Sequence, residues 1–369
     1  MIKQFLSELE PLINIDCGSL NPQGISAVAD LMQKKYESIG WHVERADFGS
    51  KTGHGLRITN KPDANAYDLV LIGHLDTVFP DGTVALRPMS VKGERAYGPG
   101  VADMKSGVLL MHFALRNLDP KVLDNLSICV LLNPDEEIGS IYSHEWIGEH
   151  AKKSKCVLVC ESARIDGSLV KARKGVGEFY LNFKGVPAHA GNDPQKGRSA
   201  ILEMAQWTVA LHSLSDFEKG TTLNVGIVSG GTTSNTVPEH AQAKLDIRFW
   251  DNTEFDRIEA ILHKMQSAPF ITGLSIEIKR AAHKPAMYPS AATELLMRVI
   301  EEAGTKVGID IKWQAVGGGS DANFTAALGI PSLDGLGPIG GCFHSEDEYL
   351  ELASIEPRIK LLQEIINKL

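Results

Sequence analysis

The sequence predicts an α/β protein, in which a domain with a mainly parallel β-sheet carries an inserted ferredoxin-like α+β domain. Three observations support this prediction. Short apolar runs alternate with helical patterns in the two outer parts of the chain. In the middle of the chain, apolar and polar residues alternate within the strand-like segments instead. The chain also has 369 residues, a length that favours two domains over one.

The strands of the larger domain are predicted from apolar runs bounded by turn residues, at 68–73, 127–133, 156–160 and about 331–335. Helical periodicity occurs at 104–118, 291–303 and 355–369. Short apolar strands that alternate with helices are typical of a parallel sheet covered on both faces. This domain is expected to comprise residues 1–170 and 285–369.

The inserted domain is expected to span residues 171–284. Its predicted elements are a strand, a helix, two strands, a helix and a strand, at 178–184, 198–212, 222–229, 241–249, 253–267 and 275–280. The order β-α-β-β-α-β is that of a ferredoxin-like unit. Polar residues alternate along the strand at 241–249, which fits a sheet with one face exposed to water.

Charge and hydropathy exclude several classes of partner. The net charge is -9, whereas binding to nucleic acid requires a basic surface. No run approaches about 18 consecutive apolar residues, so no membrane span is expected. The N-terminal segment lacks the basic and apolar regions of a signal peptide.

Cysteine usage favours a reducing compartment, and therefore a cytoplasmic protein. Of the five cysteines, Cys129, Cys156 and Cys160 lie in strand-like runs, where a reduced thiol acts as a small hydrophobe. The spacing of Cys156 and Cys160 also suits a metal-binding pair. A zinc site of that kind requires a second pair of ligands, which is not present in the sequence.

Five potential metal ligands are expected at one edge of the parallel sheet. His74, Glu137 and Glu161 follow closely on predicted strands. Asp103 precedes the helix at 104–118, and His344 lies in a glycine-rich loop after the last strand. Since open α/β sheets bind ligands at the carboxyl ends of their strands, these side chains are expected to meet. Imidazole nitrogen and carboxylate oxygen suit zinc, cobalt or manganese.

Three acidic residues have further predicted roles. Asp76 lies two residues after His74 on an extended segment, so it points to the same side and is placed to accept the second ring N–H of His74. Adjacent residues point in different directions, so Glu137 can bind metal while Glu136 serves as a general base. Asp103, on its short side chain, is a candidate to bridge two ions.

A series of motifs occurs in order along nearly the whole chain: GHLDTVFPDG, GPGVADMKSG, NPDEEIGS, CES, GVPAHAG, SNTVPEHAQAKLDIR, GGGSDAN and FHSEDEY. Together they resemble the zinc peptidases of the glutamate carboxypeptidase type, within the aminoacylase/peptidase M20 family. The resemblance implies two metal ions, most simply Zn²⁺, with Co²⁺ or Mn²⁺ as alternatives. It also implies that Glu136 is the general base, that Asp103 bridges the ions and that the peptide bond after Asp103 is cis.

The resemblance also assigns residues of the inserted domain. Arg248 and Asn235 match positions that bind the substrate's carboxylate and its scissile carbonyl. His189 matches a residue that reaches the active site of the partner subunit in a homodimer formed through this domain. An arginine on the wet face of a strand is often only solvated, so the assignment of Arg248 has a plain alternative.

The implied reaction is hydrolysis of an amide bond next to a free carboxylate, in a small peptide or an N-acyl amino acid. Glu161 stands where family aminopeptidases usually have Asp and carboxypeptidases or deacylases usually have Glu. A glutamate carboxypeptidase-like exopeptidase is therefore favoured, with an N-acyl amino acid deacylase as the alternative. A metal-stabilised binding protein is disfavoured, because it would need neither Glu136 nor Asp76. The side chain beside the cleaved bond remains open, since Ser168, Arg173 and Lys174 all lie near the expected position for its recognition.

Overall fold

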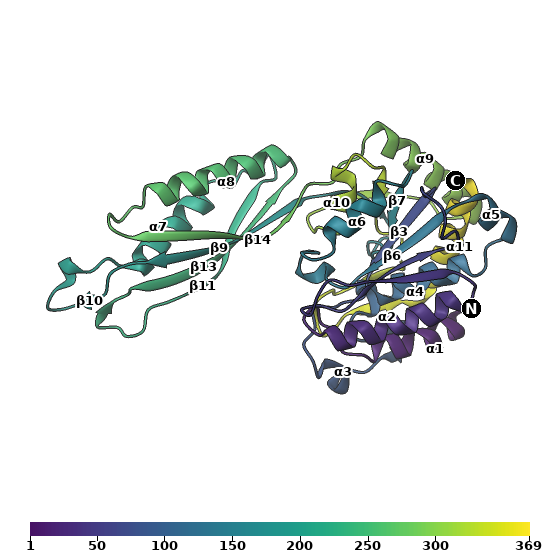
Figure 1. Ribbon diagram of the computed structural model, residues 1–369, viewed down its shortest axis with the longest axis horizontal. Coiled ribbons are helices and arrows are strands. Elements are labelled where there is room, and N and C mark those ends of the chain that lie inside the picture. Colours follow the sequence, from purple (N-terminus) through teal and green to yellow (C-terminus); the bar gives the residue numbers. More distant parts are fainter. The chain divides into compact units, whose positions relative to one another are not determined.

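The computed structural model describes residues 1–369, which form two compact units, each with its own hydrophobic core (Figure 1). The first unit comprises Met1–Ala172, Met287–Val316 and Ser320–Leu369. The second unit comprises Arg173–Ala286 and Gly317–Gly319.

A six-stranded sheet forms the centre of the first unit. Its order is β1 (His42–Ala46), β2 (Gly55–Thr59), β6 (Ile128–Asn133), β3 (Leu69–His74), β7 (Val157–Val159) and β16 (Ser332–Leu333). The last four strands are parallel, which confirms the prediction of a mainly parallel sheet. The first two are antiparallel and were not predicted. β1 is largely exposed and has no apolar run, whereas β2 is largely buried but only five residues long.

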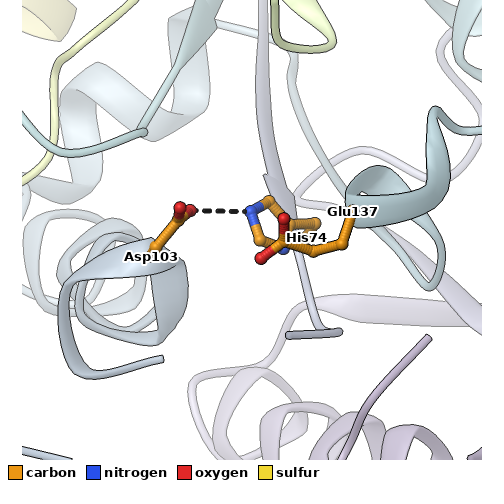
Figure 2. A group of neighbouring side chains, drawn as sticks. All are labelled: His74, Asp103 and Glu137. Atoms are coloured by element: carbon orange, nitrogen blue, oxygen red, sulfur yellow. Dashed lines mark hydrogen bonds and ion pairs between the residues drawn. The ribbon is translucent and has the colours of Figure 1, made fainter. Parts of the chain in front are cut away.

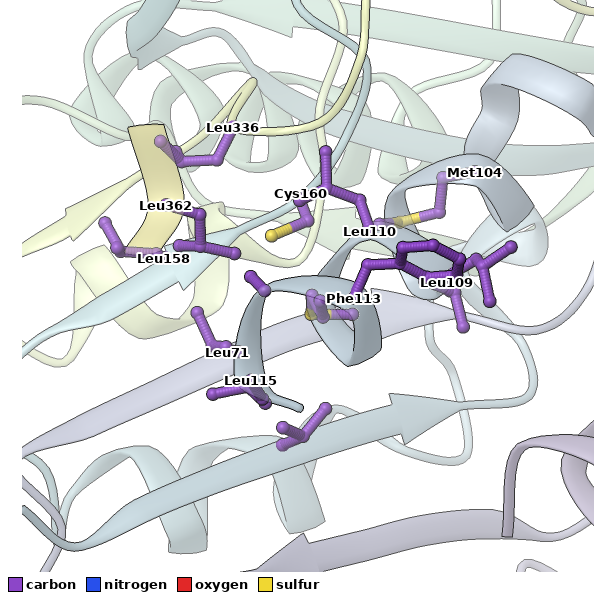
Figure 3. Packing of buried hydrophobic residues seen from close by; sticks show 14 of the residues in the cluster. Leu71, Met104, Leu109, Leu110, Phe113, Leu115, Leu158, Cys160, Leu336 and Leu362 are labelled. Carbon is purple, nitrogen blue, oxygen red and sulfur yellow. The ribbon is translucent and has the colours of Figure 1, made fainter. Parts of the chain in front are cut away.

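Helices bury both faces of this sheet. Alternate residues of a strand point to opposite faces, so Leu71 of β3 enters one core and Ile72 enters another. The larger core receives apolar residues of α1 (Ile2–Ile13), α2 (Pro22–Glu37), α4 (Ser106–Leu115), α9 (Ala291–Val307) and α11 (Leu352–Lys368). Figure 3 shows Phe113 of α4 and Leu362 of α11 with Leu71 and Leu158 in this core. The smaller core receives α6 (His144–Ala151) and α10 (Ala322–Ala327).

The predicted helices of the larger domain are present, with one correction. The helix expected at 104–118 begins at Ser106, after a π-helical turn, η1 (Val101–Lys105), in which Asp103 departs from helical dihedral angles. In α11 the predicted apolar stripe is buried, except that Leu369 is exposed at the chain end. A small antiparallel sheet also belongs to this unit, in the order β17 (Gly340–Gly341), β18 (Tyr349–Glu351), β5 (Arg95–Tyr97) and β4 (Ser90–Lys92). In addition, β8 (Leu169–Arg173) pairs with β15 (Trp313–Val316).

The second unit has the predicted order β-α-β-β-α-β. These elements are β9 (Gly175–Lys184), α7 (Ala200–His212), β11 (Thr222–Gly230), β13 (His240–Phe249), α8 (Asn252–Ser267) and β14 (Ser275–Lys284). The sheet order is β11-β13-β9-β14, and every pair is antiparallel. Both helices cover one face, where Phe179, Leu245 and Leu262 are buried (Figure 1). A short ribbon of β10 (Ala188–His189) and β12 (Thr236–Val237) extends from the sheet.

Cysteine burial agrees with the predicted core role of three thiols. Cys129, Cys156 and Cys160 are buried in the strands and cores of the first unit, and all five cysteines are free thiols. No helix of the chain combines the length and the apolar character needed to cross a bilayer.

Candidate metal centre

All five predicted metal ligands lie in the first unit, on segments that follow or adjoin its strands. His74 is the last residue of β3, and Glu161 follows β7. Glu137 lies in the 3-10 turn η2 (Glu136–Ile138), shortly after β6. Asp103 lies in the π-helical turn η1, and His344 lies in the loop between β17 and β18.

Asp103 joins two groups of side chains through its two carboxylate oxygens. Oδ1 lies 3.2 Å from Nε2 of His74, and the same nitrogen lies 3.5 Å from Oε1 of Glu161. Oδ2 lies 3.3 Å from Nε2 of His344, which in turn lies 3.3 Å from Oε2 of Glu137. Each group therefore has one imidazole and one carboxylate of its own, and the two groups share Asp103.

The three residues of Figure 2 show how compact this arrangement is. His74, Asp103 and Glu137 each offer an atom within 4.8 Å of the others. Asp103 and Glu137 approach His74 from opposite sides in this view, each from its own turn of helix (Figure 2).

The electrostatic environment of this cluster favours bound positive charge. Burial, with the charges of Asp103 and Glu136, raises the pKa of Glu137 to about 8. Burial also raises the pKa of Glu161 well above its ordinary value. Hydrogen bonds to Asp103 and Glu137 raise the pKa of His344 to about 10. For His74, burial opposes the charged form, but Glu161 and Asp103 outweigh it and raise the pKa well above its ordinary value.

The donor set fits two divalent ions. Each group offers imidazole nitrogen and carboxylate oxygen, the donors that zinc, cobalt and manganese accept. A carboxylate that presents one oxygen to each group is the expected form of a bridging ligand in a two-metal site. The raised pKa values of His74 and His344 favour the protonated imidazoles beside these carboxylates, and divalent ions would replace those protons.

Asp76 is fully buried and contacts three parts of the site. Nδ1 of His74 lies 3.0 Å from the backbone carbonyl oxygen of Asp76 and 3.3 Å from its carboxylate Oδ1, so the predicted carboxylate contact is present but the carbonyl is the nearer acceptor. Its carboxylate also accepts the backbone N–H groups of Glu136 and Glu137, both at 3.1 Å, and the hydroxyl of Ser19 at 2.6 Å. Asp76 therefore fixes both the ring of His74 and the turn that carries the two glutamates.

Two residues that contact the site were not predicted from the sequence. Ser19 lies far from Asp76 along the chain, and no pattern marks it. Glu348 is buried, and its carboxylate accepts backbone N–H groups of the turn that contains Asp103. Its position in the quoted motif FHSEDEY was the only available indication. The predicted cis peptide bond between Asp103 and Met104 is present.

The predicted substrate-binding residues lie in the second unit, at two different places. His189 of β10 and Asn235 lie side by side, since His189 pairs with Thr236 and the Asn235 carbonyl accepts the N–H of Ala190 at 2.9 Å. Arg248 lies near the other end of β13. Its Nε and Nη2 donate to the carboxylate of Asp246, at 3.0 and 2.8 Å.

The glycines of the motif GGGSDAN pack with the second unit rather than the first. The carbonyl of Gly318 accepts a hydrogen bond from Nη1 of Arg173 at 2.9 Å. Asp321 is the N-cap residue of α10.

Sequence comparison identifies the family. The profile of peptidase family M20/M25/M40 matches residues 70–368. The chain belongs to this family. As a member it is a hydrolase of the peptidase or amidohydrolase kind.

Individual M20 relatives span nearly the whole chain. Carboxypeptidase G2 of Pseudomonas sp. is 29% identical over 98% of this chain and 88% of its own length. Acetylornithine deacetylase of Proteus mirabilis is 26% identical over 93% of this chain and 90% of its own length. Among solved structures, the M20 family metallo-carboxypeptidase Sso-CP2 of Sulfolobus solfataricus superposes with a TM-score of 0.76 at 19% identity, over 98% of each chain. That structural likeness supports the fold.

Metal stoichiometry tests the division of the ligands into two groups. Because Asp103 belongs to both groups, Asp103→Ala should remove nearly all bound zinc. His344→Ala should leave the group of His74, Asp103 and Glu161 intact, and so retain about one ion of the pair. Elemental analysis of the purified variants measures this, with exposed His42→Ala as the control. Full zinc content in Asp103→Ala would exclude the bridging role.

Proposed function

We propose that this M20 family member is a two-metal hydrolase that cleaves an amide bond next to a free carboxylate, as a glutamate carboxypeptidase-like exopeptidase. The observation that carries the proposal is the Asp103 carboxylate, whose two oxygens each face an imidazole and a further carboxylate. An N-acyl amino acid deacylase is the second candidate, and the likeness to acetylornithine deacetylase and to succinyl-diaminopimelate desuccinylase favours it. The same metal centre would serve both reactions.

In the proposed reaction, the protein residues move and hold protons. Two divalent ions, zinc or else cobalt or manganese, would supply Lewis acidity and lower the pKa of a water molecule towards neutrality. Glu136 takes the proton of the attacking water and then gives it to the leaving amine. The position of Glu136 supports this role. Burial is the main cause of the raised pKa of Glu137 and Glu161, and the charge of the nearby Glu136 is a further cause for both. Its backbone is held by Asp76.

Arg248 is proposed to bind the carboxylate beside the cleaved bond. Its guanidinium already holds the carboxylate of Asp246 through two nitrogens, which is the geometry of bidentate carboxylate recognition. A substrate carboxylate would take the place of Asp246 or share the guanidinium with it. Lys174 is close by, since burial and then the charge of Arg248 lower the pKa of Lys174. Two neighbouring cations suit a substrate with two carboxylates, such as an acyl-glutamate.

A homodimer through the second unit is proposed because His189 and Arg248 are far apart within one chain. β9 and β13 are antiparallel, and the ribbon with His189 follows the end of β9 that pairs with His240. Arg248 lies eight positions further along β13, which corresponds to roughly 25 Å. A dipeptide spans only about 7 Å. One substrate can therefore contact both residues only if they come from different chains.

The exposed edge of the second unit's sheet is suited to such pairing. β11 is an edge strand, and it exposes 64% of Ile227 and 56% of Val228. An exposed apolar edge strand readily pairs with another strand. We therefore place the proposed dimer contact at β11.

The general-base role predicts a variant that binds metal but does not turn over. Glu136→Gln keeps the size of the side chain and removes its ability to take a proton, so kcat should fall about 10²–10⁴-fold. Zinc content should be unchanged, because Glu136 is not in the proposed ligand set. Activity on acyl-glutamates and dipeptides, measured with zinc content, checks this. Glu145→Gln, exposed on α6, is the control. Retained activity in Glu136→Gln would remove this residue from the mechanism.

Substrate carboxylate binding predicts different effects for Arg248 and Lys174. Arg248→Ala should raise KM about 10- to 100-fold for every substrate with a carboxylate beside the bond, since a charged hydrogen bond is lost. Lys174→Ala should raise KM for acyl-glutamates and leave acyl-alanines nearly unaffected. Arg280→Ala, which breaks an ion pair elsewhere in the second unit, is the control. Unchanged KM values in Arg248→Ala would show that Arg248 does not bind the substrate and that its ion pair with Asp246 is structural only.

The dimer proposal predicts complementation between two impaired variants, measured as kcat/KM. If His189 of one chain and Arg248 of the other serve one site, a mixed dimer of His189→Ala and Arg248→Ala retains one intact site. After unfolding and refolding together, an equal mixture should recover about a quarter of the wild-type activity, by random pairing of chains. Refolding each variant alone is the control. An absence of recovery in a mixture that forms dimers would show that one chain supplies both residues.

A further inference from the structure

Glu348 is a buried acid that lies behind the metal centre and has no place in the proposed ligand set. Only 1% of it is exposed to solvent. It follows His344 by four positions and directly precedes β18. Its Oε1 accepts the backbone N–H groups of Ala102 at 2.8 Å and Asp103 at 3.0 Å, and its Oε2 accepts that of Gly100 at 3.1 Å.

The segment that Glu348 holds is not fixed by regular secondary structure. Gly100 has a positive φ of 73°, and Asp103 departs from helical dihedral angles within η1. The N–H groups at the start of a helical turn have no partner in that turn, so another acceptor must satisfy them. Lys105, also buried, ties the far end of the segment to the first unit through a hydrogen bond from its Nζ to the carbonyl of Ile15 at 3.1 Å.

We propose that Glu348 is a positioning residue that sets the affinity of the metal pair by holding the backbone of Asp103. With three N–H groups held, the Asp103 carboxylate stays between His74 and His344 with one oxygen facing each. Glu348 and His344 also belong to one segment, so the same contact ties together the two loops that supply these ligands. The inference rests on the proposed two-metal site.

A carboxylate suits this position better than any uncharged group. Its two oxygens offer enough lone pairs for three donors, and a buried N–H without a partner costs about 1–3 kcal/mol. Glutamine keeps the shape but replaces one oxygen with an NH2 group. That group would face either the N–H of Gly100 or those of Ala102 and Asp103, and it cannot accept from them. Aspartate keeps both oxygens but shortens the side chain by one methylene.

Zinc affinity is the direct measurement of this proposal. The metal-free full-length protein is titrated with Zn²⁺ in competition with a chelator of known affinity. Glu348→Gln should raise the Kd for zinc about 10- to 100-fold, the usual cost of removing a group that orients a ligand. Glu348→Asp should fall between Glu348→Gln and wild type, and Glu346→Gln, an exposed neighbour, should match wild type. At saturating zinc, KM should stay near the wild-type value, since Glu348 is buried and its carboxylate accepts backbone N–H groups.

The thermal unfolding midpoint of each metal-free variant shows whether the substitution destabilises the fold, whereas the zinc affinity shows whether it disturbs the metal site. Zinc affinity of Glu348→Gln within about twofold of wild type would overturn the proposal, whatever happens to the midpoint. If Glu348→Gln does not fold, Glu348→Asp is judged by the same criterion, with a weakened zinc affinity expected and an unchanged one contradicting the proposal. A wild-type protein that binds no zinc would refute the metal centre itself, which is a different result from a tight-binding variant.

Discussion

The candidate site depends on one electrostatic constraint: three carboxylates and two imidazoles converge within hydrogen-bonding and ion-pair distances of one another. Burial, and then the like charges of neighbouring carboxylates, raise the pKa of Glu137 and Glu161. The same carboxylates raise the pKa of His74 and His344. Such an arrangement costs free energy, because three carboxylates that repel one another share only two imidazoles. Divalent ions, as proposed, would reduce this repulsion. Asp103 contributes most to this constraint, since it is the one carboxylate that both groups share.

The surrounding fold provides rigid support for groups that repel one another. Parallel strands end at a common edge, which brings His74, Glu137 and Glu161 together from distant parts of the chain. Two further buried acids then hold backbone instead of metal. Asp76 binds the N–H groups of Glu136 and Glu137, and Glu348 binds those around Asp103. Both contacts hold a candidate ligand through its main chain, which leaves the carboxylate of Glu137 or Asp103 free for the proposed metal binding.

The second unit carries the residues that are proposed to bind substrate. Its antiparallel sheet carries the proposed substrate-binding groups at its two ends, with Arg248 and Lys174 at one end and His189 with Asn235 at the other. The length of β13 prevents a single chain from bringing both sets to one small substrate. Strand geometry therefore links the proposed recognition of substrate to the proposed dimer.

The sequence by itself determined the α/β architecture, the β-α-β-β-α-β order and the proximity of the five candidate ligands. It could do so because apolar runs mark buried strands, and because parallel strands end at one edge. It did not predict β1, whose five residues lack an apolar run, or the turn that delays α4 until Ser106. Only the tertiary structure decided which imidazole faces which oxygen of Asp103, that Asp246 pairs with Arg248, and that Ser19 and Glu348 support the site. These are contacts between segments far apart in the chain, made through loops whose paths depend on packing, and no local periodicity encodes them.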